Sequence, residues 1–394
     1  MISTAEAKAI ISKNTNALEP VSLLLFEAAG KMLSEDIFAQ MDIPAFPQSS
    51  MDGYAFSFDA WKQGKPLIIE GESAAGNNQQ LTLPTGKAAR IFTGAPVPDG
   101  ADTVIMQEKV KIKDNQLLIE DAELQKENSV RSAGSEIKKG ALALPAGTLL
   151  SPAAIGFLAS IGIATAKVIP DPTIIIIVTG NELQQPGEPL QYGQVYESNS
   201  IMLGTALKQV HMTGSKILHA EDKLPLLTSV LKTALEQADL VLLTGGISAG
   251  DYDFVLPAAG ACDVRTLFHK IKQRPGKPLF FGKKGNKLVF GLPGNPSSVL
   301  TCFYEYVLPA LSHLTGRSLG LKTIKAALSK PYKKSAALTV FLKAFYDGER
   351  VTVLDAQESY RLSSFAKSNC LLVMEENAGE CAEGAITEIH LLPE

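Results

Sequence analysis

Between residues 171 and 310 the chain alternates apolar runs with amphipathic stretches, and this alternation constrains the fold more than any other feature. Residues 172–180, PTIIIIVTG, and 239–246, DLVLLTGG, are continuous apolar runs, as expected for strands that are buried on both faces. Stretches with helical spacing at 198–210 and 223–238 separate these runs. Repeated alternation of strand and helix predicts a doubly wound, mainly parallel sheet.

Polar residues follow these strands at the point where each strand ends. Glu182 follows the first apolar run, and Asp251 and Asp253 follow the second. A third run, 286–292, leads into the turn at 293–298. If the strands are parallel, all of these residues lie on one edge of the sheet, where open α/β sheets bind their ligands. This convergence is the strongest clue to function that the residues themselves supply.

The turn within 289–300, VFGLPGNPSSVL, holds two glycines and two prolines, more than a simple connection needs. Gly291 and Gly294 are expected to let the backbone approach a ligand closely, and Pro293 to stiffen the turn. Asn295 is a candidate helix cap, with a proline suited to the next position. The segment is either a rigid capped turn or an anion site at a helix start, and the similar loops beside it favour the anion site.

Two acids in the stretch 244–254, TGGISAGDYDF, suggest a cation. The stretch does not match G-x-G-x-x-G, and neither it nor 291–298 is a P-loop, because the Gly-Lys-Ser/Thr ending is absent. Carboxylates beside an anion-binding loop repel phosphate unless a cation intervenes. Asp251 and Asp253 therefore suggest Mg²⁺, which bridges carboxylate and phosphate oxygens. The alternative is that either carboxylate caps the following helix.

A Pro-Gly turn in 272–282, KQRPGKPLFFG, adds positive charge before another strand. Arg274 and Lys277 flank this turn and could hold a phosphate or another oxyanion. The alternative is a pair of solvated surface charges.

Outside this segment the chain has helical and β-like parts. Residues 4–14 and 18–37 show helical patterns, whereas short β-like runs between 53 and 150 predict a small, mostly antiparallel module. Residues 141–166 carry no charge and are long enough to span a membrane, but five Pro and Gly residues divide them. Ser151, followed by a proline, predicts instead a short buried helix flanked by turns. The C-terminal part returns to β-like runs and is expected to form a separate small domain.

The composition is that of a globular protein, with 45% hydrophobic and 20% charged residues. The formal net charge of −4 argues against a binder of duplex nucleic acid. The four cysteines lie far apart, which favours buried thiols in a reducing compartment, and the five scattered histidines give little support to a histidine-ligated metal site. The N-terminus lacks the layout of a signal peptide, so we expect a soluble, cytoplasmic protein without membrane contact.

Seven motifs, taken together and in order, resemble the molybdopterin molybdenumtransferase family, known as MoeA in bacteria and as the E domain of gephyrin in animals. They lie within residues 49–298 and read SMDGYAF, RIFTGAPVPDGADTVIMQE, GSEIKKG, TGNEL, TGGISAGDYDF, RPGKPLFFG and GLPGNPSS. Seven ordered motifs are far more specific than any one of them, whereas the C-terminal segment matches weakly.

The resemblance implies an α/β multidomain protein whose doubly wound, mainly parallel sheet, at 171–315, is of the molybdopterin-binding type. The N-terminal region, 1–170, is expected to be a helical domain with an inserted β-rich domain at about 53–130, and a small β-barrel is expected at 320–394. The resemblance also implies a homodimer whose active cleft combines the α/β domain of one subunit with N-terminal residues of the other. The implied reaction takes adenylylated molybdopterin and molybdate, with Mg²⁺, inserts molybdenum and releases AMP.

Matched position by position, the resemblance implies catalytic roles for Asp52, Thr93, Glu182, Asp222 and Asp253. The acids expected to bind Mg²⁺ are Asp251, Asp253 and Glu182. The residues expected to bind the substrates lie in the loops and turns already described: Gly245, Gly246, Ser248, Gly250, Arg274, Lys277, Pro293, Gly294, Asn295, Pro296 and Ser298. Lys277 and backbone N–H groups would stabilise the phosphates while Mg²⁺ polarises the phosphoanhydride.

The chain also departs from the family pattern. Asn181 and Glu136 stand where Asp is usual, Arg274 stands where Lys is common, and Lys343 stands where Arg is common. The expected C-terminal pattern is retained only at Ser363, Ser364 and Asn369. The C-terminal departures concern oxyanion binding by the last domain more than the chemistry.

Three other functions are compatible with parts of the sequence. A molybdopterin adenylyltransferase shares the α/β domain but usually lacks an N-terminal extension of roughly 170 residues; such an enzyme is also a candidate partner. A non-catalytic scaffold, as gephyrin's E domain is when it clusters receptors, would not need Asp52, Glu182, Asp222 and Asp253. A metal-free binder of sugar phosphates or nucleotides fits the α/β pattern by itself.

Overall fold

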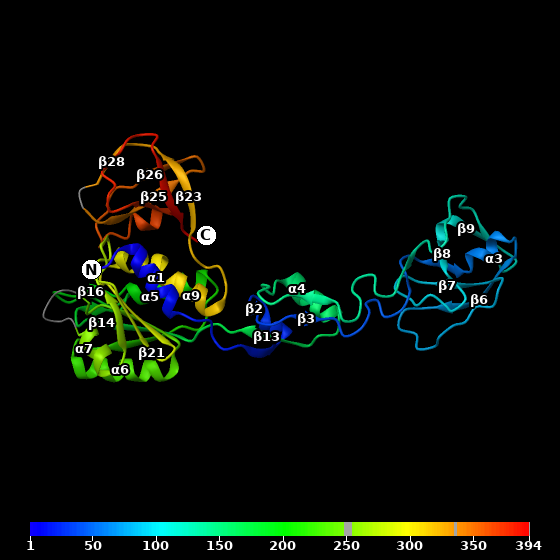
Figure 1. The fold of residues 1–394 in the computed structure, drawn as a ribbon, viewed down its shortest axis with the longest axis horizontal. Coiled ribbons are helices and arrows are strands. Elements are labelled where there is room, and N and C mark those ends of the chain that lie inside the picture. Colours follow the sequence, from blue (N-terminus) through cyan, green and yellow to red (C-terminus); the bar gives the residue numbers. More distant parts are fainter. Residues whose placement is uncertain (248–253, 335–336, 394) are drawn as a thin grey trace. The chain divides into compact units, whose positions relative to one another are not determined.

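The computed structural model describes residues 1–247, 254–334 and 337–393 (Figure 1). The chain forms two compact units, Met1–Val21 with Ile169–Glu394, and Ser22–Val168. Within the described part of the chain, no helix is long and apolar enough to cross a membrane. All four cysteines are free thiols, and three of them are buried.

A six-stranded sheet forms the centre of the first unit, with the strand order β17-β14-β18-β22-β21-β19. Its strands are β14 (Ile174–Thr179), β17 (Lys216–Ala220), β18 (Leu240–Thr244), β19 (Arg265–His269), β21 (Phe280–Lys284) and β22 (Lys287–Leu292). The first four strands in this order are parallel, and β21 and β19 are antiparallel to their neighbours. In this register Ile176 lies between Ile217 and Leu242. The predicted doubly wound, mainly parallel sheet is confirmed.

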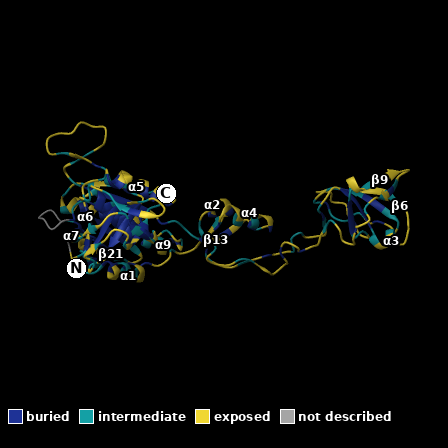
Figure 2. Cartoon of the chain, turned by 90° about the horizontal axis from the view of Figure 1, so that it is seen from above, coloured by how far each residue is buried: buried dark blue, intermediate teal, exposed yellow. Residues whose placement is uncertain are grey.

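Helices cover both faces of this sheet because its central strands are apolar on both sides. One face carries α1 (Thr4–Asn14), α5 (Asn199–Gln209) and α9 (Leu308–Thr315), and the other carries α6 (Leu224–Gln237) and α7 (Val255–Ala261) (Figure 1). Ile176 packs with the first group of helices and Ile177 with the second. Burying one such side chain stabilises the fold by roughly 2 kcal/mol, so these strands dominate the core (Figure 2).

The turn after β22 begins a helix at the predicted residue. Asn295 is the N-cap residue, and Pro296 is the first residue of α8 (Pro296–Cys302). The helix continues through a π-helical segment, η2 (Phe303–Val307), into α9. Residues 296–315 therefore form one continuous helical rod that starts at the carboxyl edge of the sheet.

The role expected for Gly291 is wrong. Gly291 lies buried inside β22, where an added Cβ would stand 2.7 Å from Ile247 Cδ1 and 3.1 Å from Phe280 Cβ. The glycine is therefore required by packing beneath the turn and not by the approach of a ligand. At Gly294, by contrast, none of the described residues beyond its chain neighbours has an atom within 4 Å of an added Cβ.

The helix expected at 18–37 is also wrong. This segment contains β1 (Val21–Leu24), a four-residue helix α2 (Leu25–Ala28), β2 (Met32–Leu33) and β3 (Ile37–Phe38). β1 and β2 pair with β13 (Thr165–Ile169) in the sheet β1-β13-β2, and β3 pairs with β12 (Leu142–Leu144). Pairing with strands from much later in the chain overrides the local helical pattern because it buries Leu25 and Leu33.

The uncharged segment 141–166 forms a helix at the predicted place, but the helix is not buried. In α4 (Pro152–Ser160), the Ser151 hydroxyl accepts a hydrogen bond from the N–H of Ala154 at 3.2 Å, and Pro152 takes the first position. Within α4 only Leu158 is fully buried, and the other side chains are partly or largely exposed (Figure 2). The expectation of a buried helix is therefore corrected to a capped surface helix.

A six-stranded sheet of order β8-β5-β7-β6-β10-β9 forms the β-rich part of the second unit. Its strands are β5 (Gly53–Phe56), β6 (Leu67–Ser73), β7 (Lys87–Ile91), β8 (Thr103–Met106), β9 (Val110–Lys113) and β10 (Gln116–Ile119). All neighbours are antiparallel except β6 and β7, and Tyr54, Phe56 and Ile105 contribute to the core.

A closed barrel ends the chain. Its strands are β23 (Lys322–Leu328), β25 (Thr339–Tyr346), β26 (Arg350–Val353), β27 (Cys370–Met374) and β29 (Ile386–Leu391), and pairing of β25 with β27 completes the ring. A short strand from the α/β part, β20 (Gln273–Arg274), pairs in parallel with β25. The strand that leads into the Pro-Gly turn is therefore paired directly with the barrel.

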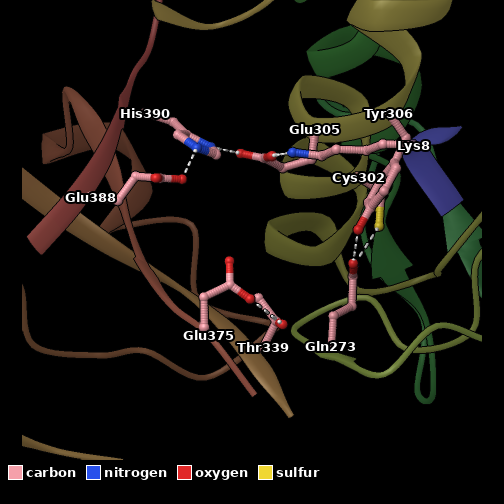
Figure 3. A network of polar contacts seen from close by, with 9 residues as sticks. All are labelled: Lys8, Gln273, Cys302, Glu305, Tyr306, Thr339, Glu375, Glu388 and His390. Carbon is pink, nitrogen blue, oxygen red and sulfur yellow. Dashed lines mark hydrogen bonds and ion pairs between the residues drawn. The ribbon is translucent and has the colours of Figure 1, made fainter. Parts of the chain in front are cut away.

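A buried polar network connects α1, the helical rod and the barrel (Figure 3). The Glu305 carboxylate, in a side chain only 2% exposed, accepts from Lys8 Nζ at 2.6 Å and contacts His390 Nδ1 at 2.6 Å. The second ring nitrogen of His390 lies 3.1 Å from Glu388. An imidazolium can donate to both carboxylates, whereas the neutral ring donates to one.

The charges in this network shift two pKa values. Burial raises the pKa of Glu305, but hydrogen bonds and charges from His390 and Lys8 lower it below its ordinary value of 4.5 overall. Burial lowers the pKa of His390, but Glu305 raises it above 6.5 overall. The Glu305 contribution to stability is therefore present above pH 4.5 and is lost as pH falls through its folded pKa. The His390 contribution is complete below pH 6.5 and is lost as pH rises through its folded pKa.

We predict that His390→Gln lowers the urea midpoint most at pH 5 to 6, by an amount that corresponds to about 2 kcal/mol. The difference from the wild type should shrink as pH rises above 6.5 through the raised pKa of His390, because the wild-type imidazole then loses its charge. Urea unfolding followed by circular dichroism at each pH measures this difference. His219→Gln, at an exposed position of β17, is the matched control, and a difference that stays constant from pH 5 to 9 would contradict the prediction.

Candidate functional site

A cavity of about 950 Å³ lies where the parallel strands end, with one wall from the α/β part and another from the barrel. The α/β wall includes Glu182 after β14, Asn199 at the start of α5, and most of the turn 293–298 after β22. The barrel wall includes Leu338 and residues 357–360. The cavity therefore lies at the edge that the sequence pattern assigns to ligand binding.

Eight of the residues predicted to form the site line this cavity. They are Glu182, Arg274, Lys277, Pro293, Gly294, Asn295, Pro296 and Ser298. The structure thus brings together residues from three separate loops, of which the first and the last are more than 100 positions apart in the sequence.

Hydrogen bonds from the Gln273 side chain hold the Pro-Gly turn between the two cations, and the same side chain contacts Tyr306 (Figure 3). The Gln273 side chain, in a residue only 1% exposed, donates from Nε2 to the carbonyls of Pro275 at 3.0 Å and Gly276 at 3.3 Å. The Tyr306 hydroxyl donates to its Oε1. Gly276 has a φ of 84°, which favours glycine. A buried amide therefore fixes the turn between the two cations.

Arg274 and Lys277 themselves are exposed on the cavity wall. Within the described ranges, neither side chain has an ion-pair partner. Two exposed cations that flank a rigid turn are suited to hold phosphate or another oxyanion.

Asp222, Gly245 and Gly246 lie at the same edge of the sheet but outside the lining of the cavity. The Thr179 hydroxyl donates to the Asp222 carboxylate, and the N–H of Asp222 donates to Asn181 Oδ1 at 3.2 Å. The amide oxygen of Asn181 serves here in the place of a carboxylate oxygen.

Gly245 has a structural reason for being glycine. Its φ is 93°, and an added Cβ would lie 2.1 Å from the carbonyl oxygen of Thr179. The end of β18 could not approach β14 this closely with any other residue. Gly246, with a φ of 57°, also lies in the left-handed region.

Sequence reasoning missed Asn199, which connects two strand-end loops. Its Nδ2 donates to Thr244 Oγ1 at 2.9 Å and to the carbonyl of Gly294 at 2.9 Å. Its Oδ1 is buried and has no hydrogen-bond partner among the described residues. The sequence SNS shows only a helix start, and that pattern does not reveal that the amide spans the gap between β18 and the turn after β22.

Comparison with known proteins identifies the family. Three family models match: the MoeA N-terminal region (domain I and II) at 2–162, a probable molybdopterin binding domain at 175–313, and the MoeA C-terminal region (domain IV) at 325–392. A molybdopterin molybdenumtransferase from Haemophilus influenzae is 37% identical over 385 residues, covering 94% of each chain. The chain belongs to the molybdopterin molybdenumtransferase family.

Other relatives agree with this assignment. Molybdopterin molybdenumtransferase 2 from Mycobacterium tuberculosis is 31% identical over 406 aligned positions and 99% of each chain. The crystal structure of a molybdopterin biosynthesis MoeA protein from Pyrococcus horikosii matches with a TM-score of 0.84 and 27% identity, covering 100% of each chain. The protein is therefore a transferase of molybdenum cofactor biosynthesis, and the predicted fold class is confirmed.

The two remaining described residues of the predicted site, Asp52 and Thr93, lie in the second unit. Asp52 Oδ1 accepts from both the N–H and the hydroxyl of Thr93, each at 2.8 Å. The pKa of Asp52 is lowered, mainly by the hydrogen bond from the Thr93 N–H and next by the one from its hydroxyl. The positive charge of Arg90 lowers it further. The Arg90 guanidinium lies 5.1 Å from the ring centres of both Tyr54 and Phe92. Asp52 is thus held as a carboxylate, with one oxygen fixed by Thr93.

The remaining predicted residues, Ser248, Gly250, Asp251 and Asp253, lie outside the described residues. Of the three carboxylates expected to bind Mg²⁺, Glu182 is the one that the structure describes, and it is exposed. No group of three or more His, Cys, Asp or Glu side chains within the described ranges is arranged to hold a metal ion. Mg²⁺ takes about six oxygen ligands, and Glu182 fits as one of them.

We predict that Gly276→Ala disrupts the cation turn. An added Cβ would stand 2.4 Å from Cys302 Sγ and 2.9 Å from Gln273 Nε2, in addition to the strain of a left-handed φ. The expected loss is about 3 kcal/mol, measured as a lower urea midpoint.

Gly285→Ala is the matched control for this prediction. Gly285 also has a positive φ, 57°, but no atom lies within 4 Å of an added Cβ. The control should lose only about 1 kcal/mol. Equal losses at the two positions would show that contact with Cys302 and Gln273 is not the constraint.

Proposed function

We propose that the protein inserts molybdenum from molybdate into adenylylated molybdopterin, with Mg²⁺, and releases AMP. The observation that carries this proposal is the pair of cations, Arg274 and Lys277, on one wall of the 950 Å³ cavity. Molybdate and the two phosphates of adenylylated molybdopterin are oxyanions, which are ligands that such a pair favours. Membership of the family supports the same reaction.

In the proposed mechanism the chain acts mainly by electrostatics. Lys277 and Arg274 hold the phosphate oxygens. They stabilise the charge that grows on AMP as an oxygen of water or molybdate bonds to the other phosphorus and the P–O bond to AMP breaks. Mg²⁺, when bound, would polarise the phosphoanhydride, and Glu182 is the described carboxylate that would help to hold the ion. Asn199 keeps two strand-end loops together, so the groups that contact the substrate stay in place.

We further propose that the protein is a homodimer whose active cleft combines the α/β domain of one subunit with Asp52 and Thr93 of the other. Exposed apolar side chains of the second unit, Phe26 at 92% and Leu24 at 57%, support a contact with another chain.

Four free thiols support a reducing, cytoplasmic location. A molybdopterin adenylyltransferase is the partner that would supply the substrate.

The first test measures AMP release from adenylylated molybdopterin with Mg²⁺, with and without molybdate. The wild type should release AMP only when molybdate is present. Lys277→Ala should lower kcat/KM about 100-fold, because a fixed cation at the phosphates is lost. Lys208→Ala, an exposed lysine of α5 outside the cavity, is the control and should behave as the wild type. Release of AMP in the absence of molybdate would contradict the proposed reaction.

The second test addresses the shared cleft by mixing two inactive variants, Asp52→Ala and Lys277→Ala. After dissociation and reassociation, about half of the dimers carry one chain of each kind, and each has one intact cleft. The mixture should therefore recover roughly a quarter of the wild-type activity. If each cleft were built from a single subunit, mixing would restore nothing.

A further inference from the structure

Lys343 is buried at a place where strand alternation predicts exposure. Its neighbours in β25, Leu342 and Ala344, point into the barrel core, so Lys343 lies on the outer face of the strand. It is nevertheless only 3% exposed, because residues 354–361 cover it. We refer to these residues as the 354–361 loop.

The ammonium group of Lys343 is fully engaged by this loop. Its Nζ donates to the carbonyls of Ala356 at 2.7 Å, Arg361 at 3.0 Å and Glu358 at 3.3 Å. Three donors thus meet three backbone acceptors, which offsets the cost of taking a cation out of water. Burial lowers the pKa of Lys343, although the nearby Glu358 carboxylate raises it.

Two further contacts fix the same loop. The Gln357 carboxamide accepts from the N–H of Lys343 at 3.0 Å and donates to its carbonyl at 2.8 Å, as a neighbouring strand would. The Ser364 hydroxyl donates to the carbonyl of Ala356 at 2.7 Å. Ala356 has a φ of 60°, an unusual value for alanine that these surrounding contacts sustain.

The other side of the loop lines the 950 Å³ cavity with residues 357–360. Ser359 also bonds to the start of α8: its hydroxyl accepts from Asn295 Nδ2 at 2.9 Å, and its carbonyl accepts from the N–H of Ser297 at 3.1 Å. A shift of the loop would therefore move one wall of the cavity and release the turn on the opposite wall.

We infer that Lys343 is a positioning residue for the proposed reaction: it holds the 354–361 loop in the shape that forms the barrel wall of the substrate cavity. This inference rests on the proposed function. All three donors of Lys343 already have backbone partners, so the side chain organises the wall and does not bind an oxyanion directly.

The experiment compares Lys343→Met with Lys343→Arg. Lys343→Met keeps the length of the side chain but leaves three carbonyls without their donor. We expect KM for adenylylated molybdopterin to rise about tenfold while kcat changes less than about twofold, and Lys343→Arg to restore KM to within about twofold of the wild type. Ser364→Ala, a milder change to the same loop, should shift KM in the same direction by a smaller factor.

Asp347→Ala is the matched control for loss of barrel stability. Asp347 accepts from the N–H groups of Glu349 and Arg350 at the β25–β26 turn and lines no part of the cavity. The Asp347→Ala variant should leave KM for adenylylated molybdopterin unchanged. If Lys343→Met raises KM for molybdate alone, or if Asp347→Ala raises KM for adenylylated molybdopterin equally, the inference is wrong.

Amide hydrogen exchange tests the loop without depending on the reaction. Residues 354–361 should exchange at least about tenfold faster in Lys343→Met than in the wild type, and Lys343→Arg should restore their protection. Unchanged exchange in Lys343→Met would overturn the inference even if the enzyme is active. A wild type that releases no AMP would instead contradict the proposed function, while exchange would still decide whether Lys343 sets the loop.

Discussion

The parallel pairing of four strands, three of which are apolar and buried, is the constraint on which the rest of the structure depends. Because β14, β17, β18 and β22 are parallel, their carboxyl ends meet at one edge, and each connection must return across a face of the sheet. The return helices bury both faces, and the strand-end loops converge on the cavity. The close approach of the ends of β18 and β14 explains why Gly245 carries no side chain.

Local sequence patterns predicted the elements whose partners are close in the sequence or whose burial is complete. The strands β14 and β18 were evident because both of their faces are apolar, and the cap at Asn295 because it is set by adjacent residues. The segment 18–37 was misjudged because its strands pair with β12 and β13, far along the chain. No pattern of short range can reveal a pairing of that kind.

The site was predictable on one wall and not on the other. Ordered motifs and strand ends located Glu182, Arg274 and Lys277, which all line the cavity. The barrel wall carries no comparable motif, because its loop is held by hydrogen bonds to backbone carbonyls, which every residue type has. Lys343 binds three carbonyls, and Lys334 likewise donates to the carbonyls of Leu338, Glu375 and Glu376. Which lysines donate to backbone carbonyls and which are exposed on the cavity wall became visible only with the fold.

The contact between Lys8 and Glu305 joins residues 297 positions apart, and this separation has a consequence for synthesis of the chain on the ribosome. α1 is made before the second unit, yet the surfaces that bury Ala7 and Ile11 include α9 and are made only after it. The second unit, Ser22–Val168, can fold before α1 has its packing partners. α1 therefore docks later than elements that are synthesised after it.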